Sequence, residues 1–286
     1  MQKKLVVFLV LCALVILLAP VVVLGQQSFT KLDYPGATNT YAMGINSRGD
    51  IVGYYSISGI VSGFFLGRGG FVSINYPEAN YTDVWSINPA GDIVGSYYDA
   101  NWIQHGYLLH HGIFTSIDVP DAMFTAAFGI NPEGDIVGHY GVPPAGRMNG
   151  FLLRNGQFTT YDYPDPNLMT CGMGINPEGQ IVGHYQIGMV VHGFLMNEGV
   201  FTTIDIPGAK TTQPYGINPD GEIVGFYIEA ATSNVHGFSL DQWGVFTQID
   251  VPGAVKTWAR RNNPRGELVG NYLDASGKAH GFLMRR

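Results

Sequence analysis

Apolar and polar residues alternate in short runs along most of this chain, which is the period of half-buried β-strands. The segment 114–153 shows the pattern clearly, with the turn sequence Asn-Pro-Glu-Gly at 131–134. These turn residues suit a type I turn. Strand-like runs lie at 114–118, 125–130, 135–140 and 149–153. The segment is therefore predicted to form a meander of four antiparallel strands.

The same arrangement recurs six times. Each unit carries Asp-x-Pro, then Gly-Ile-Asn-x-x-Gly-Asp-Ile-Val-Gly-x-Tyr, then His-Gly-Phe-Leu, with substitutions. The leading prolines recur every 42 to 45 residues, at Pro35, Pro77, Pro120, Pro164, Pro207 and Pro252. A period of this length with four strands per unit is typical of propeller blades. We predict an all-β fold, a six-bladed β-propeller with four antiparallel strands per blade.

The two ends of the chain have complementary sequences. Residues 29–33 match the strand that follows Gly-Phe-Leu in the other units, and the last unit stops at 280–283 without that strand. We predict that the N-terminal strand completes the last blade and closes the ring. A stacked solenoid would instead need polar caps, and the ends show none.

The first 25 residues form a separate segment. Lys3 and Lys4 precede an apolar run at 5–24, which is followed by Gly25 and Gln26. This pattern predicts a secretory signal peptide over 1–25. The alternative is an uncleaved anchor, because about 20 apolar residues span a bilayer. Residues 26–286 are predicted to be a single propeller domain that is secreted or periplasmic, with no membrane span after cleavage.

Charge and cysteine content narrow the range of partners. The formal net charge is −7, whereas nucleic-acid binding relies on clustered Lys and Arg, so we expect no nucleic-acid partner. Cys171 is the one cysteine beyond the signal segment, so no intrachain disulfide is expected. The chain has no Gly-x-Ser-x-Gly, phosphate loop or His-Glu-x-x-His. We expect a monomer without a cofactor.

The repeated motif resembles a known family. Gly-Ile-Asn-x-x-Gly-x-Ile-Val-Gly-x-Tyr followed by His-Gly-Phe-Leu is similar to the HAF-type probable extracellular repeat of bacterial exported proteins, where His-Ala-Phe usually stands for His-Gly-Phe. The similarity covers all six units. It implies an exported bacterial protein of propeller-like form, and it supplies no catalytic residues.

Loop lengths indicate where a ligand would bind. The Asn-Pro-x-Gly hairpins are short and uniform, whereas the loops after Asp-x-Pro and after Gly-x-Tyr vary and are predicted to lie together on the opposite face. Variable loops on a rigid scaffold are where binding usually resides. We call this face the variable-loop face and the other the hairpin face.

Two kinds of repeated polar residue are predicted to be structural. Histidines that precede Gly-Phe are replaced by Ser62 and Asn149 in other units, which favours a hydrogen-bonding role; they are His105, His192, His236 and His280. The aspartates of Asp-x-Pro are predicted to hydrogen-bond their own turn backbone; they are Asp33, Asp118, Asp162, Asp205 and Asp250.

Two histidines lie one repeat apart, at the position before the repeated tyrosine. His139 and His184 fall in adjacent units and could face each other at the channel mouth. With Asp121 or Asp165 nearby, they are the candidates for a metal or catalytic site. Simple polar filling of the channel is the alternative, and no metal or catalytic residue is assigned.

The sixth unit departs most from the repeat. Arg261, Asn262 and Asn263 replace Gly-Ile-Asn, and Arg260 precedes them. Two arginines on an innermost strand could bind a carboxylate or uronate through the guanidinium fork. The alternative is a rim ion pair. The aromatic residues that lie close by in sequence register are Trp85, Phe128, Tyr215 and Trp258.

These observations favour a binding module over an enzyme. The predicted ligand is a glycan or a small anion, held on the variable-loop face by the two arginines, the aromatic residues and the two histidines named above. One alternative is an extracellular polysaccharide lyase or hydrolase with its site at the channel mouth. Another is a purely structural repeat protein, in which side chains plug the channel.

Overall fold

The structure is a computed structural model that describes residues 27–144, 146–165 and 169–286. The predicted signal peptide lies outside the described residues. Over the described ranges the chain folds into 24 β-strands and contains no helix. Accordingly, no helix in this part of the chain is long and apolar enough to cross a membrane.

The first three sequence units each form a four-stranded antiparallel sheet in chain order. The first sheet comprises β2 (Asn39–Ile45), β3 (Ile51–Ile57), β4 (Ile60–Gly67) and β5 (Gly70–Ile74). The second comprises β6 (Tyr81–Ile87), β7 (Ile93–Tyr98), β8 (Gln104–His110) and β9 (Ile113–Ile117). The third comprises β10 (Thr125–Ile130), β11 (Ile136–Val142), β12 (Arg147–Arg154) and β13 (Gln157–Tyr161).

The fourth and fifth units are linked by a parallel pairing of Val191 with Thr211. The fourth unit comprises β14 (Met169–Ile175), β15 (Ile181–Ile187), β16 (Val190–Asn197) and β17 (Val200–Ile204). The fifth comprises β18 (Ala209–Ile217), β19 (Ile223–Glu229), β20 (Val235–Leu240) and β21 (Phe246–Ile249). Both keep the meander order, so four antiparallel strands per unit are confirmed, with strand ends shifted by a residue or two. The grouping predicted for 114–153 is wrong by one strand: β9 pairs with β8 in the second sheet, and β13 completes the third. The reason is that the Asp-x-Pro turn at 118–120 leads the chain from the outer strand of one sheet to the innermost strand of the next.

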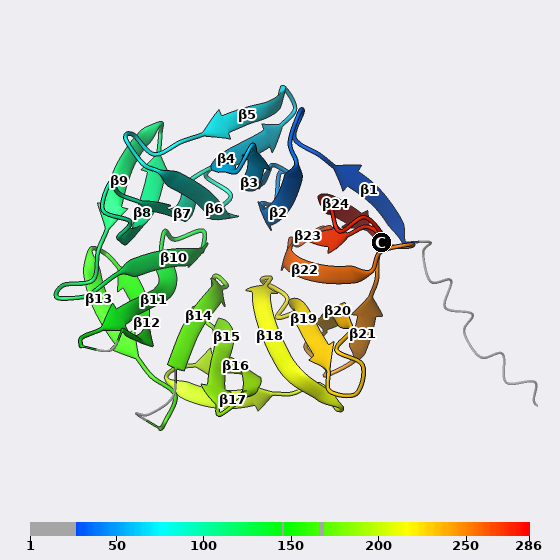
Figure 1. Ribbon diagram of the computed structural model, residues 1–286. Helices are drawn as coiled ribbons and strands as arrows, with labels where there is room; N and C mark the ends of the chain where they lie inside the picture. The colour runs from blue at the N-terminus through cyan, green and yellow to red at the C-terminus, as the bar shows by residue number, and fades with distance from the viewer. Residues whose placement is uncertain (1–26, 145, 166–168) are drawn as a thin grey trace, which may run out of the picture.

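The last sheet combines the two ends of the described chain. It comprises β22 (Lys256–Asn262), β23 (Leu268–Leu273), β24 (Ala279–Arg285) and β1 (Ser28–Leu32). β1 pairs antiparallel with β24 along its whole length, from Ser28 opposite Arg285 to Leu32 opposite Gly281. Figure 1 shows the sheets around a common axis, with β2, β6, β10, β14, β18 and β22 nearest to it, which is the arrangement of a β-propeller.

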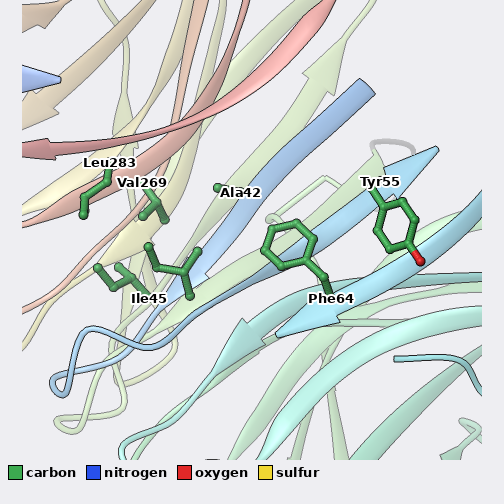
Figure 2. Close-up of a cluster of buried hydrophobic side chains, with 7 residues drawn as sticks. Ala42, Ile45, Tyr55, Phe64, Val269 and Leu283 are labelled. Carbon is green, nitrogen blue, oxygen red and sulfur yellow. The ribbon is translucent and has the colours of Figure 1, made fainter. Parts of the chain in front are cut away.

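The core lies between neighbouring sheets. The aromatic residue of each His-Gly-Phe motif is fully buried; these are Phe64, Tyr107, Phe151, Phe194, Phe238 and Phe282. Figure 2 shows one inter-sheet cluster, in which side chains of the first unit meet those of the last. Burial of each large apolar side chain stabilises the fold by roughly 1.5–3 kcal/mol. The labelled members are Ala42, Ile45, Tyr55, Phe64, Val269 and Leu283.

In four of the hairpins an asparagine links one unit to the next; these are Asn46, Asn88, Asn131 and Asn263. Asn131 accepts a hydrogen bond from the Asp135 amide at 2.8 Å and donates through Nδ2 to the Asn176 carbonyl of the following unit at 3.3 Å. Asn263 of the last unit donates in the same way to the Asn46 carbonyl of the first at 3.0 Å. The motif is therefore a turn and an inter-unit tie at once.

The prediction for the Asp-x-Pro carboxylates is wrong. The turn amide instead donates its hydrogen bond to a threonine hydroxyl at the start of the following strand. In the third unit, the Val119 amide donates to Thr125 Oγ1 at 3.0 Å. The aspartate is thereby left to bind the repeated histidine: His192 Nδ1 lies 2.9 Å from Asp205 Oδ2. The histidine pairs are His105–Asp118, His192–Asp205, His236–Asp250 and His280–Asp33, and Asn149 replaces the histidine at Asp162.

Candidate functional site

A bulge in every innermost strand places one extra residue near the axis. The pairing with the second strand skips one position in each unit, for example between Ala259 and Arg261. A bulged residue is unpaired and turns the strand, so its side chain is re-aimed. The six bulged residues are Met43, Trp85, Phe128, Met173, Tyr215 and Arg260.

Aromatic rings from four units form a continuous contact network around the axis. Trp85 packs edge-on against Phe128, with ring centroids 4.7 Å apart, and lies 6.5 Å from Tyr215. The network continues through Phe226 to Trp258, with centroid distances of 5.8 and 6.4 Å. Trp85, Tyr215 and Trp258 are half-buried, so each residue keeps some exposure to solvent. The structure thus brings the three aromatic candidates together.

Arg260 lies on this aromatic surface. Its guanidinium carbon is 4.4 Å from the centroid of Tyr215 and 5.5 Å from that of Phe226. Nε donates to Asn271 Oδ1 at 3.1 Å, and no protein atom accepts from the buried Nη1. The half-buried Arg260 forms no ion pair with a described residue. Its guanidinium packs against aromatic rings and not against a carboxylate, so its charge is not paired within the described residues.

Arg261 points elsewhere, although it is the next residue. It is 9% exposed, and Nη2 donates to the carbonyls of Phe128 and Met173 at 2.7 and 2.6 Å. The side chain therefore reaches from the sixth unit to the third and fourth. Burial lowers the pKa of Arg261 to about 10, and the Arg260 charge acts in the same direction. The two arginines predicted as one anion site are thus separated in their contacts.

His139 and His184 are close enough for their charges to interact. Burial lowers the pKa of His184 to about 4; burial, and to a smaller extent His184, lowers that of His139 to about 3. Both Nδ1 atoms are buried without a protein partner, and His139 packs against Phe128 at 4.9 Å. Both imidazoles are therefore neutral at pH 7.

The metal and catalytic candidates differ in burial: the two histidines are half-buried, whereas the aspartates predicted beside them are exposed. Asp121 and Asp165 are exposed on the loops after Asp-x-Pro. Among the described residues, no group of three His, Cys, Asp or Glu side chains could hold a metal ion. The described partners of Arg260 and Arg261 include neither imidazole.

Sequence reasoning missed one titratable residue. Asp83 on β6 is 5% exposed, and Oδ1 accepts hydrogen bonds from the Ser96 amide and hydroxyl, both at 2.8 Å. Burial raises the pKa of Asp83 to about 6, although the hydrogen bonds from Ser96 act in the opposite direction. The available signal was an aspartate at a position where the other units carry Tyr41, Ala126, Cys171, Gln213 and Trp258.

A large groove lies away from the axis. It has a volume of ≈ 1130 Å³ and runs along the outer strands of the fourth and fifth units. Its lining includes Asp205, Glu229 and Asp241, and no Lys, Arg or His among the described residues. Because it offers carboxylates and no cation, it does not suit the predicted anionic ligand.

Comparison with known proteins identifies the fold. No family model and no curated relative matches the chain. A triple arginine-to-alanine mutant of AofleA from Arthrobotrys oligospora aligns over 91% of this chain and 87% of its own, at 12% identity and a TM-score of 0.55. A gluconolactonase from Xanthomonas campestris aligns over 91% and 90%, at 11% identity and a TM-score of 0.50. At such identities the likeness concerns the fold alone.

Proposed function

We propose that this protein is a binding module for a glycan or small ligand that carries a carboxylate. The site is the Arg260 region, which comprises Arg260, Tyr215, Trp258 and Trp85 on the innermost strands around the axis. Half-buried aromatic rings suit the apolar faces of a sugar, and a guanidinium suits a uronate.

One observation carries the proposal. Arg260 is packed on Tyr215 at 4.4 Å with no carboxylate partner among the described residues and with Nη1 unpaired. A surface arginine would normally be solvated, and a structural one would normally be paired. A half-buried cation that packs on an aromatic ring and lacks a carboxylate partner is arranged to receive an anion.

The proposal includes the form and location of the protein. We infer a closed six-bladed ring, supported by the pairing of β1 with β24 and by the Asn263–Asn46 tie. Membership of the HAF-type repeat family and export directed by residues 1–25 are supported by the motif and by the apolar N-terminal run. A rigid exported ring would present the Arg260 region to polymers outside the cytoplasm.

Binding to defined oligosaccharides tests the function. Calorimetry against oligogalacturonates and oligoglucuronates, with their neutral counterparts alongside, should show saturable binding of the acidic sugars. Arg260→Ala should weaken it by about 10-fold or more, because a charge-assisted hydrogen bond and a stacked cation are both lost. Trp258→Ala should weaken the binding of acidic and neutral sugars to the same extent.

Arg68→Ala is the matched control. Arg68 lies in the turn between β4 and β5 on the hairpin face, so its loss changes net charge equally without touching the Arg260 region. Equal binding by wild type and Arg260→Ala would exclude the Arg260 region as the site. Absence of binding to every acidic sugar would favour the structural alternative.

A further inference from the structure

The hairpin end of the axis contains a small cavity that the proposed function does not use. Its volume is ≈ 90 Å³, and it is lined by the Ile-Asn-Pro segments of the hairpins together with Arg261. Water occupies about 30 Å³ per molecule in the liquid, so the cavity has room for a small ion and its hydration. Arg261 is the one charged residue in the described lining.

Arg261 is incompletely neutralised there. Nη2 donates to two carbonyls, but Nη1 is buried with no protein acceptor, and no described carboxylate lies within ion-pair distance. The nearby positive charge of Arg260 further disfavours the charged form of Arg261. A buried, unpaired charge is strongly unfavourable unless a counter-charge accompanies it.

Two departures from the repeat occur at the same structural position. Glycine stands there in the other units, as Gly44, Gly129, Gly174 and Gly216, but Ser86 and Arg261 occupy it in the second and sixth. Both line the cavity. A Cβ on Gly174 would lie 2.8 Å from Arg261 Nη1, so glycine there makes room for the guanidinium. This position therefore places an arginine and a serine in the lining of one cavity.

We propose that this cavity binds one small monovalent anion of chloride size, with Arg261 as its cation and Ser86 as a hydroxyl donor. The site is distinct from the Arg260 region, because none of the four residues of that region belongs to the cavity lining. The anion would act as a structural counter-ion, and it would couple the stability of the ring to halide concentration through binding to the folded state.

Thermal unfolding at constant ionic strength provides the test. Sodium chloride replaces sodium methanesulfonate from about 1 to about 200 mM, and the wild-type Tm should rise and saturate, as expected when a ligand binds only the folded state. Arg261→Gln should abolish the saturable rise. Ser86→Gly, which restores the residue of four other units, should fold and weaken the apparent chloride affinity by roughly 3- to 10-fold.

Controls keep the result interpretable. Arg68→Gln changes charge on the outer surface and should keep the wild-type chloride response. Arg260→Ala should also keep a saturable response, so failure of sugar binding and failure of the anion site are distinguishable. If Arg261→Gln does not fold, ³⁵Cl NMR provides the test. The wild-type protein should broaden the chloride line, and Ser86→Gly should broaden it less. A Tm independent of chloride, or unchanged broadening in Ser86→Gly, would overturn the proposal and leave water as the occupant.

Discussion

At the scale of single residues, the functional candidates differ in what stabilises or removes their charge. Arg260 is held by rings, Arg261 by carbonyls, and Asp83 by donors from Ser96. His139 and His184 are neutralised by losing their proton, since burial lowers both pKa values. The side chains near the axis are thus each adapted to a low-dielectric setting by a different route.

The half-buried His139 and His184, whose Nδ1 atoms are buried, predict an acid-sensitive fold. An unfolded imidazole titrates near pH 6.5, whereas the folded pKa of His184 is about 4. Between these values the unfolded chain takes up protons and the folded protein does not. Stability should therefore fall as pH decreases through this window, by up to ~1.4 kcal/mol per pH unit for each histidine.

His184→Asn removes one of these titrations and introduces the residue of the sixth unit, Asn271. Chemical denaturation gives the free energy of unfolding at pH 7 and at about pH 4.5. The decrease between the two pH values should be smaller in His184→Asn than in wild type by ~1–2 kcal/mol. The exposed His111→Asn should keep the wild-type slope. Asp83 titrates with an opposite slope, because burial raises its pKa to about 6, but this contribution is common to all three proteins. Identical slopes in wild type and His184→Asn would contradict the neutral, buried state.

At the scale of strands, repetition made the architecture predictable. The period, the Asn-Pro-x-Gly turns and the alternation located the four strands of each unit to within a residue or two. The bulge was not predictable, because a period of two assumes an unbroken strand. The extra residue sends Arg260 to the half-buried Tyr215 surface and Arg261 into the interior. A pair of arginines that looked like one site is therefore divided between two.

The glycine of each Gly-x-Tyr motif shows a second limit of the sequence. It recurs in all six units, but the reason for it is steric and three-dimensional. A Cβ on Gly183 would lie 2.0 Å from the Cys171 carbonyl of the paired strand and 2.8 Å from the buried Phe194 ring. Neither neighbour can withdraw, because one is sheet backbone and the other fills the core.

Gly183→Ala should accordingly cost ~3 kcal/mol or more, in the range of severe overpacking. Gly69→Ala is the matched control, since a Cβ there meets nothing within 4 Å. Urea unfolding should place Gly69→Ala within about 0.5 kcal/mol of wild type. A Gly183→Ala variant of near-native stability would show that the two innermost strands of the unit can separate to admit a methyl group.

At the scale of the whole molecule, contacts between the first and last units carry the inferred closure. β1 pairs with β24, His280 Nδ1 lies 2.8 Å from Asp33 Oδ1, and Asn263 ties to Asn46. Burial raises the pKa of Asp33, but hydrogen bonds from His280 and Lys31 outweigh this effect and lower it overall. The sixth unit thus repeats the histidine–aspartate pairing of the interior units with residues from opposite ends of the chain.

If β1 is a missing strand of the last sheet, its covalent origin should not matter. Ser28 stands opposite Arg285, so a short Gly/Ser linker from 286 to 27 would convert the pairing into an ordinary turn. New ends between Gly69 and Gly70 would open an exposed turn, where permutation is usually tolerated. We expect this permutant of residues 27–286 to melt within a few degrees of the unpermuted 27–286 chain.

Deletion of residues 27–33 should instead lower Tm by more than about 10 °C. It exposes the unpaired edge of β24 and removes the packing of Phe29 against Phe282. Unfolding scans of the three proteins give the comparison. A deletion variant as stable as the parent would mean that β1 is dispensable, and the ring would then have to be held by inter-sheet packing alone.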